Sequence, residues 1–317
     1  MSSPHASHIS HEDLPDCYTS SRARLTIRKL SEHLGAEVEG VDLSKAVSAN
    51  VFSDIEQAWV THGVLTLREQ TLSPAMHIDF SSRFGELVGH VVSRFGLSDY
   101  PQVTILSNIE DDKGQKIGAD RAGMIWHSDL SFTQRPSLGS FLYGVECPPE
   151  GGDTEFSSTR AAYDALPEDL AQRLAGVHGV HDYAWHYRTY LSHRRPLSDT
   201  EKAQTPAVIH PALRTHPVTK ATTIYLSEGL TARIAELPED EGRALILEVS
   251  QFATQEQFVY RHRWQPNDLV MWDNRLTMHR ATEFAQHHRR LMRRTTALGN
   301  RPFFTHTAAG ASAVAST

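Results

Sequence analysis

The sequence predicts a mainly β protein with flanking helices, folded in one domain as a double-stranded β-helix, the jelly-roll of cupin-like proteins. Three observations favour this fold. Short apolar segments with strand-like alternation recur along the chain, amphipathic helical segments lie between them, and no internal repeat is present. A chain of 317 residues buries an ample core, and its hydrophobic (39%) and charged (22%) fractions are ordinary for a globular protein.

The first half of the chain contains four strands and two helices with clear end signals. Ser48 precedes an amphipathic segment that stops at Gly63, and Ser73-Pro74 begins a second one that stops at Gly85. The polar, glycine-bearing loop at 111–123 is a plausible lid. In chain order we expect strands at 25–27 and 36–40, a helix at 51–63, a strand at 64–67, a helix at 74–84 and a strand at 138–145.

The second half begins with helical segments and ends with strands. Residues 182–206 are charged and aromatic with few periodic apolar positions, which predicts an insertion that shapes substrate access. Two strand-like runs separated by the turn Gln265-Pro266-Asn267-Asp268 predict a β-hairpin. In chain order we expect helices at 160–176, a helix from 238, hairpin strands at 258–264 and 269–272, and a strand at 291–298.

Charge and composition exclude several classes of protein. The net charge of −7 leaves no excess of Lys and Arg to neutralise phosphates, so nucleic-acid binding is not expected. No apolar run approaches the length of a membrane span, and no secretory signal segment is visible. Only Cys17 and Cys147 occur, which favours a reduced, cytoplasmic setting. We expect residues 1–24 and 306–317 to be flexible tails around one folded domain at 25–305.

His-x-Asp occurs three times, and pairs of this kind are expected by chance in a chain with 19 His and 38 acidic residues. The pair at 11 and 13 lies in a polar stretch and is expected to be a solvated tail. The pair at 77 and 79 lies on a predicted helix, where residues two apart point to different sides. His127 and Asp129 lie in a segment without helix signals. On an extended strand both side chains would share a face and could bind one metal ion.

Two imidazoles and one carboxylate cover one face of an octahedral ion and leave the other positions open, as non-haem Fe(II) oxygenases require. At this point several ordered segments carry a resemblance to the TauD/TfdA family of Fe(II)- and 2-oxoglutarate-dependent dioxygenases. It covers roughly residues 25–305 and is especially similar to the 2,4-dichlorophenoxyacetate (aryloxyalkanoate) branch. The segments that resemble the family signature are 126–129, 148–154, 272–275, 279–280 and 289–294.

The resemblance implies a role for each matching residue. Iron would be bound by His127, Asp129 and His279, and the far carboxylate of 2-oxoglutarate by Arg290 and Thr154. Arg294 would bind the acidic group of the substrate, with His90 near it.

Each of these assignments has a structural alternative. The arginines at 289, 290, 293 and 294 could form a solvated basic face, although an iron site favours inward Arg290 and Arg294 with Arg289 and Arg293 facing outward. Thr154 could be a turn residue and His90 a core or surface histidine. The taurine branch has an asparagine and a tyrosine where this chain has Gly123 and Ser93, so taurine is not favoured as the substrate.

The resemblance implies a dioxygenase that uses Fe(II), 2-oxoglutarate and O2, releases succinate and CO2, and hydroxylates a small anionic organic substrate. An aryloxyalkanoate-type acid, with cleavage of its ether, is the favoured example. Sulfonates, sulfate esters and natural-product acids are alternatives within the same chemistry. An alternative of another class is a non-catalytic jelly-roll sensor that binds metal and acid. The family also implies a homo-oligomer, either dimer or tetramer.

Overall fold

The computed structural model describes residues 9–192 and 194–305, and its centre is a ten-stranded, mostly antiparallel sheet. The order of strands differs from their order in the chain, because distant segments pair with one another. Along the sheet the strands are β1 (Cys17–Thr19), β2 (Thr26–Lys29), β3 (Ala36–Glu39), β4 (Val64–Leu67), β16 (Leu269–Asp273), β8 (Ser137–Glu146), β18 (Leu291–Leu298), β7 (Tyr100–Ser107) and β6 (Gly96–Leu97), with β5 (Leu87–Val88) also paired to β18.

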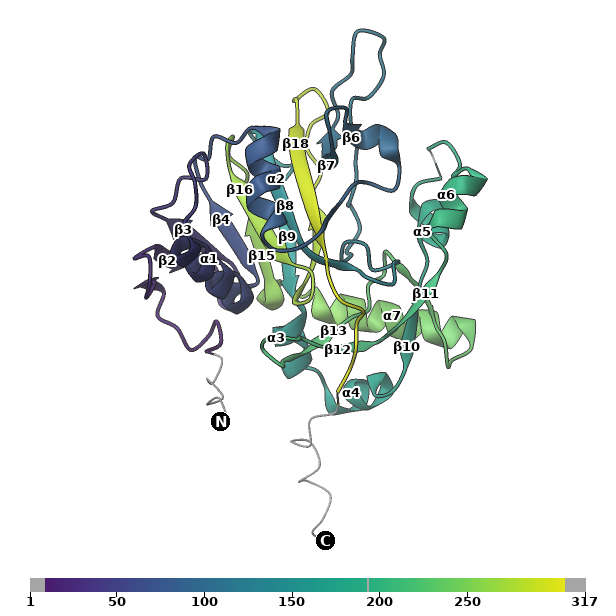
Figure 1. Cartoon of the computed structure of the whole chain (residues 1–317). Coiled ribbons are helices and arrows are strands. Elements are labelled where there is room, and N and C mark those ends of the chain that lie inside the picture. Colours follow the sequence, from purple (N-terminus) through teal and green to yellow (C-terminus); the bar gives the residue numbers. More distant parts are fainter. Residues whose placement is uncertain (1–8, 193, 306–317) are drawn as a thin grey trace.

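A second, three-stranded sheet packs against the first. Its strands are β15 (Val259–His262), β9 (Thr154–Ser158) and β17 (Thr277–Ala281), with β9 in the middle. Phe156 of β9 and Trp272 of β16 are buried between the sheets, with ring centroids 5.3 Å apart. The two antiparallel sheets with an apolar interior form the predicted jelly-roll, whose strands occupy the centre of Figure 1.

The predicted hairpin at 258–272 is wrong. β15 pairs with β9, whereas β16 pairs with β4 and β8, so the two strands belong to different sheets. The turn is nevertheless where the sequence places it, with Asn267 in the left-handed region (φ 70°). The turn carries the chain from one sheet to the other, because both strands find partners elsewhere.

Two helices cover the outer face of the large sheet, as Figure 1 shows. They are α1 (Ala49–His62) and α2 (Pro74–Ser82), capped by the side chains of Ser48 and Ser73 as their sequences predict. α2 ends two residues earlier than expected. Trp59, Phe80 and Phe141 lie in the core between helices and sheet.

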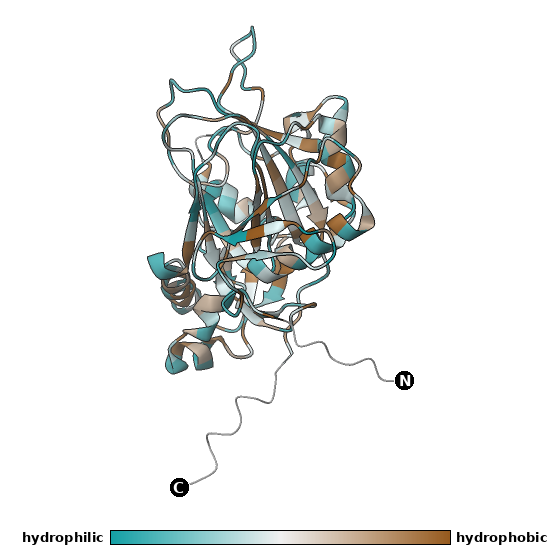
Figure 2. Ribbon diagram, turned by 90° about the vertical axis from the view of Figure 1, so that its left-hand side faces the viewer, coloured by the Kyte–Doolittle hydropathy of each residue, from teal (hydrophilic) through white to brown (hydrophobic). Residues whose placement is uncertain are grey.

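A helical and β layer lies beyond the second sheet, where α7 packs on β14 and α3. In Figure 2 brown, apolar segments occur on the central strands and in patches on the helices, and teal is common on the outer loops. The elements of this part are α3 (Thr159–Asp164), α4 (Glu168–Leu174), β10 (His178–His181), α5 (Tyr183–Tyr190), α6 (Asp199–Gln204), β11 (Val208–Pro211), β12 (Leu213–Thr215), β13 (Thr222–Ile224), β14 (Thr231–Ile234) and α7 (Glu239–Ala253). Two short 3-10 helices lie elsewhere in the chain: η1 (Ser93–Phe95) precedes β6, and η2 (Glu256–Phe258) precedes β15.

His11 of the N-terminal segment packs on the domain, which corrects the expectation that this histidine lies in a solvated tail. His11 is 1% exposed, and its Nδ1 lies 2.6 Å from Nδ1 of His62 at the end of α1. The Tyr18 hydroxyl lies 2.8 Å from Nε2 of the same His62. Residues 1–8 and 306–317, which complete the two predicted tails, lie outside the described residues.

Candidate active site

A short backbone bridge brings the two candidate imidazoles together. His127 and His279 each donate a backbone N–H to the other's carbonyl, at N···O distances of 3.1 and 2.9 Å. Their ring centroids are 4.2 Å apart. β17 supplies His279, so the second sheet of the jelly-roll fixes one histidine and the bridge aligns the other with it.

Asp129 completes the group. Its Oδ1 lies 3.7 Å from Nε2 of His127, and its Oδ2 lies 3.7 Å from Nε2 of His279. The three ligand atoms lie within 4.8 Å of one another. His127 Nδ1 donates to the Ile125 carbonyl at 2.8 Å, so the Nε2 lone pair is free for a metal. This donor set of two neutral imidazoles and a carboxylate fits Fe(II).

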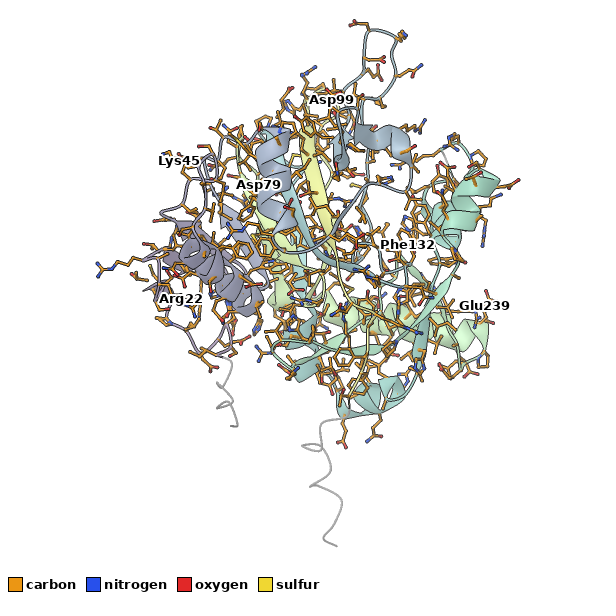
Figure 3. The ribbon with its side chains drawn as sticks, in the orientation of Figure 1. Arg22, Lys45, Asp79, Asp99, Phe132 and Glu239 are labelled. Atoms are coloured by element: carbon orange, nitrogen blue, oxygen red, sulfur yellow. The ribbon has the colours of Figure 1, made fainter. Side chains whose placement is uncertain are left out.

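The local structure around Asp129 differs from the predicted strand. Among the described residues, 127 forms only the single bridge, and Asp129 begins a turn that continues through Leu130 (φ 55°). The two side chains therefore converge because of the bridge to His279 and the turn, rather than by strand alternation. His77 and Asp79 lie on α2 as predicted, with His77 buried and Asp79 on the outer face of the helix, where Figure 3 labels it.

Three neighbours position the Asp129 carboxylate. Ser140 Oγ donates to Oδ2 at 2.6 Å, and Arg294 Nη1 donates to Oδ1 at 2.9 Å. Asn274 accepts the Asp129 backbone N–H through its Oδ1 at 3.1 Å and donates through Nδ2 to Ser140 at 3.1 Å. Burial alone would raise the pKa of Asp129, but the charge of Arg294 and the contacts with His279 and His127 outweigh it and hold that pKa well below its usual range.

Arg290 is a half-buried cation whose guanidinium has no partner among the described residues. Its guanidinium makes no hydrogen bond or ion pair with the described residues, and burial lowers its pKa to about 10, so it is charged at neutral pH. A charge that is partly withdrawn from water and unpaired is costly, and Arg290 lines the pocket, which indicates that an anionic ligand belongs beside it. Thr154 lies in the same pocket. Its hydroxyl accepts from Trp264 Nε1 at 3.0 Å, which leaves its own proton available to a ligand.

The sequence predicted that Arg290 and Arg294 share an inward face, and both line one pocket with His127, Asp129 and His279. Arg289 faces outward and pairs with Glu146 at 2.7 Å, as expected. Arg293 also lies outside the pocket lining, as expected, but it is half-buried over the Tyr143 ring and donates to the Leu72 carbonyl at 3.0 Å. The position of α2 explains the difference, because that helix covers the outer face of β18.

The pocket has a volume of about 330 Å³, within the usual range for small-molecule sites. His90 lines it, accepts a hydrogen bond from the Val92 N–H at 2.9 Å, and has its pKa lowered to about 4 by burial and then by the Arg294 charge. Gly123 also lines it, with φ 73°, and a Cβ there would lie 3.1 Å from Cε1 of His127. Ser93 is not among the lining residues.

One wall of the pocket was not predicted. Residues 183–190, expected to be irregular, form α5, and Tyr183, His186 and Tyr190 of this helix line the cavity. Tyr183 stacks on Phe132, with ring centroids 4.6 Å apart, and Figure 3 labels Phe132 between the central strands and α5. The signal was present in the sequence, since aromatic residues recur at helical spacing there.

Comparison with known proteins agrees with this site. Residues 26–296 match the family described as "Taurine catabolism dioxygenase TauD, TfdA family". The chain is 38% identical to the alpha-ketoglutarate-dependent 2,4-dichlorophenoxyacetate dioxygenase of Cupriavidus pinatubonensis, over 83% of this chain and 94% of that protein. It is 31% identical to pentalenolactone F synthase of Streptomyces avermitilis, over 89% and 96% of the two chains.

A solved structure also superposes well. The chain in the crystal structure of AAD-2 in complex with Mn(II) and N-oxalylglycine is 33% identical in sequence, and the two structures superpose with a TM-score of 0.75. The superposition covers 88% of this chain and 99% of that chain. Among the described residues, no helix is both long and apolar enough to cross a membrane. Family, fold and site chemistry agree, and the chain belongs to the TauD/TfdA family of dioxygenases, oxidoreductases that use Fe(II), 2-oxoglutarate and O2.

Proposed function

We propose that this dioxygenase hydroxylates a small anionic aromatic acid, with an aryloxyalkanoate and cleavage of its ether as the favoured case. In this proposal His127, Asp129 and His279 bind the iron. Arg290 and Thr154 bind the far carboxylate of 2-oxoglutarate. The observation that carries the proposal is one pocket that combines a three-ligand metal group with two separate guanidiniums, one unpaired and one beside the metal group.

The protein residues supply position and charge. Arg290 immediately precedes β18 and offers a planar pair of donors, which suits a carboxylate. Arg294, four residues further along, would bind the acidic group of the substrate. His90, which burial keeps neutral and whose Nδ1 accepts from Val92, can donate one further hydrogen bond there through Nε2. Buried walls of both sheets exclude water from the reacting atoms.

When bound, iron and 2-oxoglutarate supply the oxidation, in which the acid, 2-oxoglutarate and O2 give hydroxylated product, succinate and CO2. If the hydroxylated carbon carries an ether oxygen, the product is a hemiacetal and collapses to an alcohol or phenol and a carbonyl compound. The ordered anchoring of the acid decides which carbon faces the iron.

The aromatic wall favours a flat substrate. Phe132 and Tyr183 stack on each other at the pocket, and aromatic surfaces of this kind pack well against a substrate ring. The similarity to a dioxygenase of 2,4-dichlorophenoxyacetate supports the same choice. Sulfonates, sulfate esters and natural-product acids, the alternatives of the same chemistry, also carry an anionic group that Arg294 could bind.

The proposal is tested with purified protein, Fe(II), 2-oxoglutarate and O2, by measuring succinate with and without each compound of a panel. The panel holds phenoxyacetate, 2-phenoxypropionate, an alkyl sulfate, an alkyl sulfonate and a neutral phenyl ether. We expect phenoxyacetate-type acids to accelerate succinate release most and to yield the corresponding phenol. Acceleration by the neutral ether alone would contradict the role of Arg294.

The non-catalytic sensor is not favoured, because the relatives are enzymes and the iron and 2-oxoglutarate sites occur together. His127→Ala separates the two functions. It should abolish product formation and leave some binding of the acid, because Arg294 remains. If this variant forms product at the wild-type rate, His127 is not an iron ligand.

We also propose a cytoplasmic homo-oligomer, dimer or tetramer, with residues 25–305 as its catalytic domain. Cys17 and Cys147 are free thiols, which suits a reducing compartment, and the family resemblance supports the oligomer. Light scattering coupled to size exclusion gives the molar mass directly. A mass near that of one 35.5 kDa chain would contradict the oligomer.

A further inference from the structure

The pocket contains more positive charge than the proposed chemistry uses. Four arginines line it: Arg121, Arg194, Arg290 and Arg294. The carboxylates in the lining belong to Asp129, which Arg294 and the metal occupy, and to Glu283, which is exposed and makes no ion pair with the described residues. With Arg290 assigned to 2-oxoglutarate and Arg294 to the acid of the substrate, two guanidiniums remain at the outer part of the site.

Arg194 is the better placed of the two. It is half-buried, whereas Arg121 is exposed. Its Nη2 donates to the backbone carbonyl of Asp120, which ties the segment between α5 and α6 to the loop at 111–123. No carboxylate of the described residues pairs with it, so most of its five N–H donors remain available.

The charge of Arg194 reaches the interior of the site. It contributes to lowering the pKa values of His90 and His186, although burial is the largest cause for both. Arg294 lies on β18 in the large sheet, whereas Arg194 lies between α5 and α6, and Figure 1 shows these elements apart. The two cations therefore reach the pocket from different parts of the fold.

The pocket that these cations line also has an aromatic surface. Tyr183 stacks on Phe132, and Tyr183 and His186 are nearly parallel, with ring centroids 6.1 Å apart. A flat ring can lie along this wall with an anionic group at each end. The volume of the pocket suits an aryl acid with one further small substituent.

We propose that Arg194 forms a second anion-binding position, apart from that of Arg294, so that the preferred substrate is an aromatic acid carrying a second anionic group at the end of the ring remote from the reacting carbon. This inference rests on the proposed function, since it assumes that an aryl acid occupies the pocket. It extends that function by naming what distinguishes this chain's substrate.

The experiment compares two acids of the same shape, (4-carboxyphenoxy)acetate and (4-carbamoylphenoxy)acetate, which differ in the charge at the remote end. Binding is measured by calorimetry on protein loaded with Mn(II) and N-oxalylglycine, so that no turnover is needed. Turnover is measured separately with Fe(II), 2-oxoglutarate and O2. We expect the dianion to bind about five- to tenfold more tightly, the usual size of a charge-assisted contact at a half-buried site.

Variants assign the preference to Arg194. Arg194→Met should bring the affinity ratio of the two acids close to one, and Arg194→Glu should reverse it in favour of the carbamoyl compound. Arg195→Met is the matched control, because Arg195 adjoins Arg194 in the chain but is exposed and pairs with Glu201 at 2.6 Å. The control should keep the wild-type ratio.

The outcomes separate this inference from the proposed function. An equal affinity for both acids in the wild-type protein, or a preference that persists in Arg194→Met, would overturn the second anion position. A preference for the dianion without turnover of either acid would uphold the position and contradict the oxidation of aryloxy acids. If neither acid binds, both proposals are wrong.

Discussion

Arg294 and Asp129 form a direct ion pair in which Nη1 lies 2.9 Å from Oδ1. The pair is largely buried, and it connects the residue proposed to bind the substrate acid to a proposed iron ligand. An anionic substrate that approaches Arg294 competes with Asp129 for its donors. Binding of the substrate would therefore change the hydrogen bonding of Asp129, the carboxylate proposed to bind the metal.

This relationship predicts the behaviour of two substitutions. Arg294→Gln removes the charge that binds the acid and should lower kcat/KM for the aryl acid about 100-fold, as loss of a buried charged partner typically does. The half-saturating concentration of 2-oxoglutarate should change far less, because Arg290 is unaffected. Arg294→Lys should recover part of the loss. If Arg294→Gln instead greatly raises the half-saturating concentration of 2-oxoglutarate and leaves that of the aryl acid unchanged, Arg294 binds 2-oxoglutarate and the assignment of the two arginines is reversed.

Ser140 is predicted to position Asp129 without touching the metal. Ser140→Ala removes the 2.6 Å hydrogen bond to Oδ2 and should weaken Fe(II) binding roughly tenfold, as seen for outer hydrogen-bond partners of metal ligands. Ser157→Ala is the control, since Ser157 is also a buried strand serine but donates to the Ala253 carbonyl. Equal iron affinity of Ser140→Ala and the wild type, measured by competition with a chelator, would refute the prediction.

The histidine pair at the N-terminal segment should contribute to stability. The Ser31 carbonyl accepts from His11 Nε2 at 3.0 Å, so a neutral His11 accepts at Nδ1 from His62. His11→Ala leaves a buried donor of His62 unpaired and should lower the free energy of unfolding by about 1–3 kcal/mol. Urea unfolding measures this, with exposed His287→Ala as a control that should have little effect.

Acid should destabilise the fold through buried neutral histidines. Burial lowers the pKa of His77 to about 3 and that of His181 to about 3, from ordinary values near 6.5. Between pH 3 and 6.5 these histidines bind more protons in the unfolded chain than in the folded protein, so the free energy of unfolding decreases as the pH falls from about 6.5 towards 3. Above pH 6.5 they are neutral in both states and contribute no pH dependence. Each such histidine contributes a slope of about 1.4 kcal/mol per pH unit at most.

Urea unfolding at pH 7.5, 6.0 and 5.0 measures this dependence. His77→Gln should make it shallower, because the amide can still donate to the Phe141 carbonyl that lies 3.1 Å from His77 Nε2, but does not titrate. A stability that stays constant from pH 7.5 to 5.0 would show that these histidines are not buried in neutral form.

Local patterns predicted much of the fold. The strand at 291–298 and the caps of α1 and α2 follow from alternation and from Ser48, Ser73 and Gly63, all of which act within a few residues. The failures depend on partners distant in the chain. The strands on either side of Gln265 pair with other segments. His11 is buried because its ring forms a hydrogen bond with His62, which is 51 residues away in the chain.

The candidate site was predicted where short motifs fix the spacing of its residues, as they do for the metal group and the two arginines. The helix that forms the aromatic wall was missed because residues 183–190 are rich in tyrosine and histidine and lack an aliphatic stripe. A helix this short depends on tertiary packing, which local sequence patterns do not reveal. Ser140 carries no motif, and only the pairing of β8 with β16 and β18 brings it to Asp129.

The central claim is that His127, Asp129 and His279 bind iron in the same pocket in which Arg290 binds 2-oxoglutarate. Anaerobic titration of the metal-free protein with Fe(II) and then 2-oxoglutarate tests it through the weak visible charge-transfer absorption of the combined complex. We predict saturation at one iron per chain, loss of the absorption in His127→Ala, and a higher 2-oxoglutarate requirement in Arg290→Met but not in Arg289→Met. No absorption in the wild type, or an undiminished one in His127→Ala, would contradict the account.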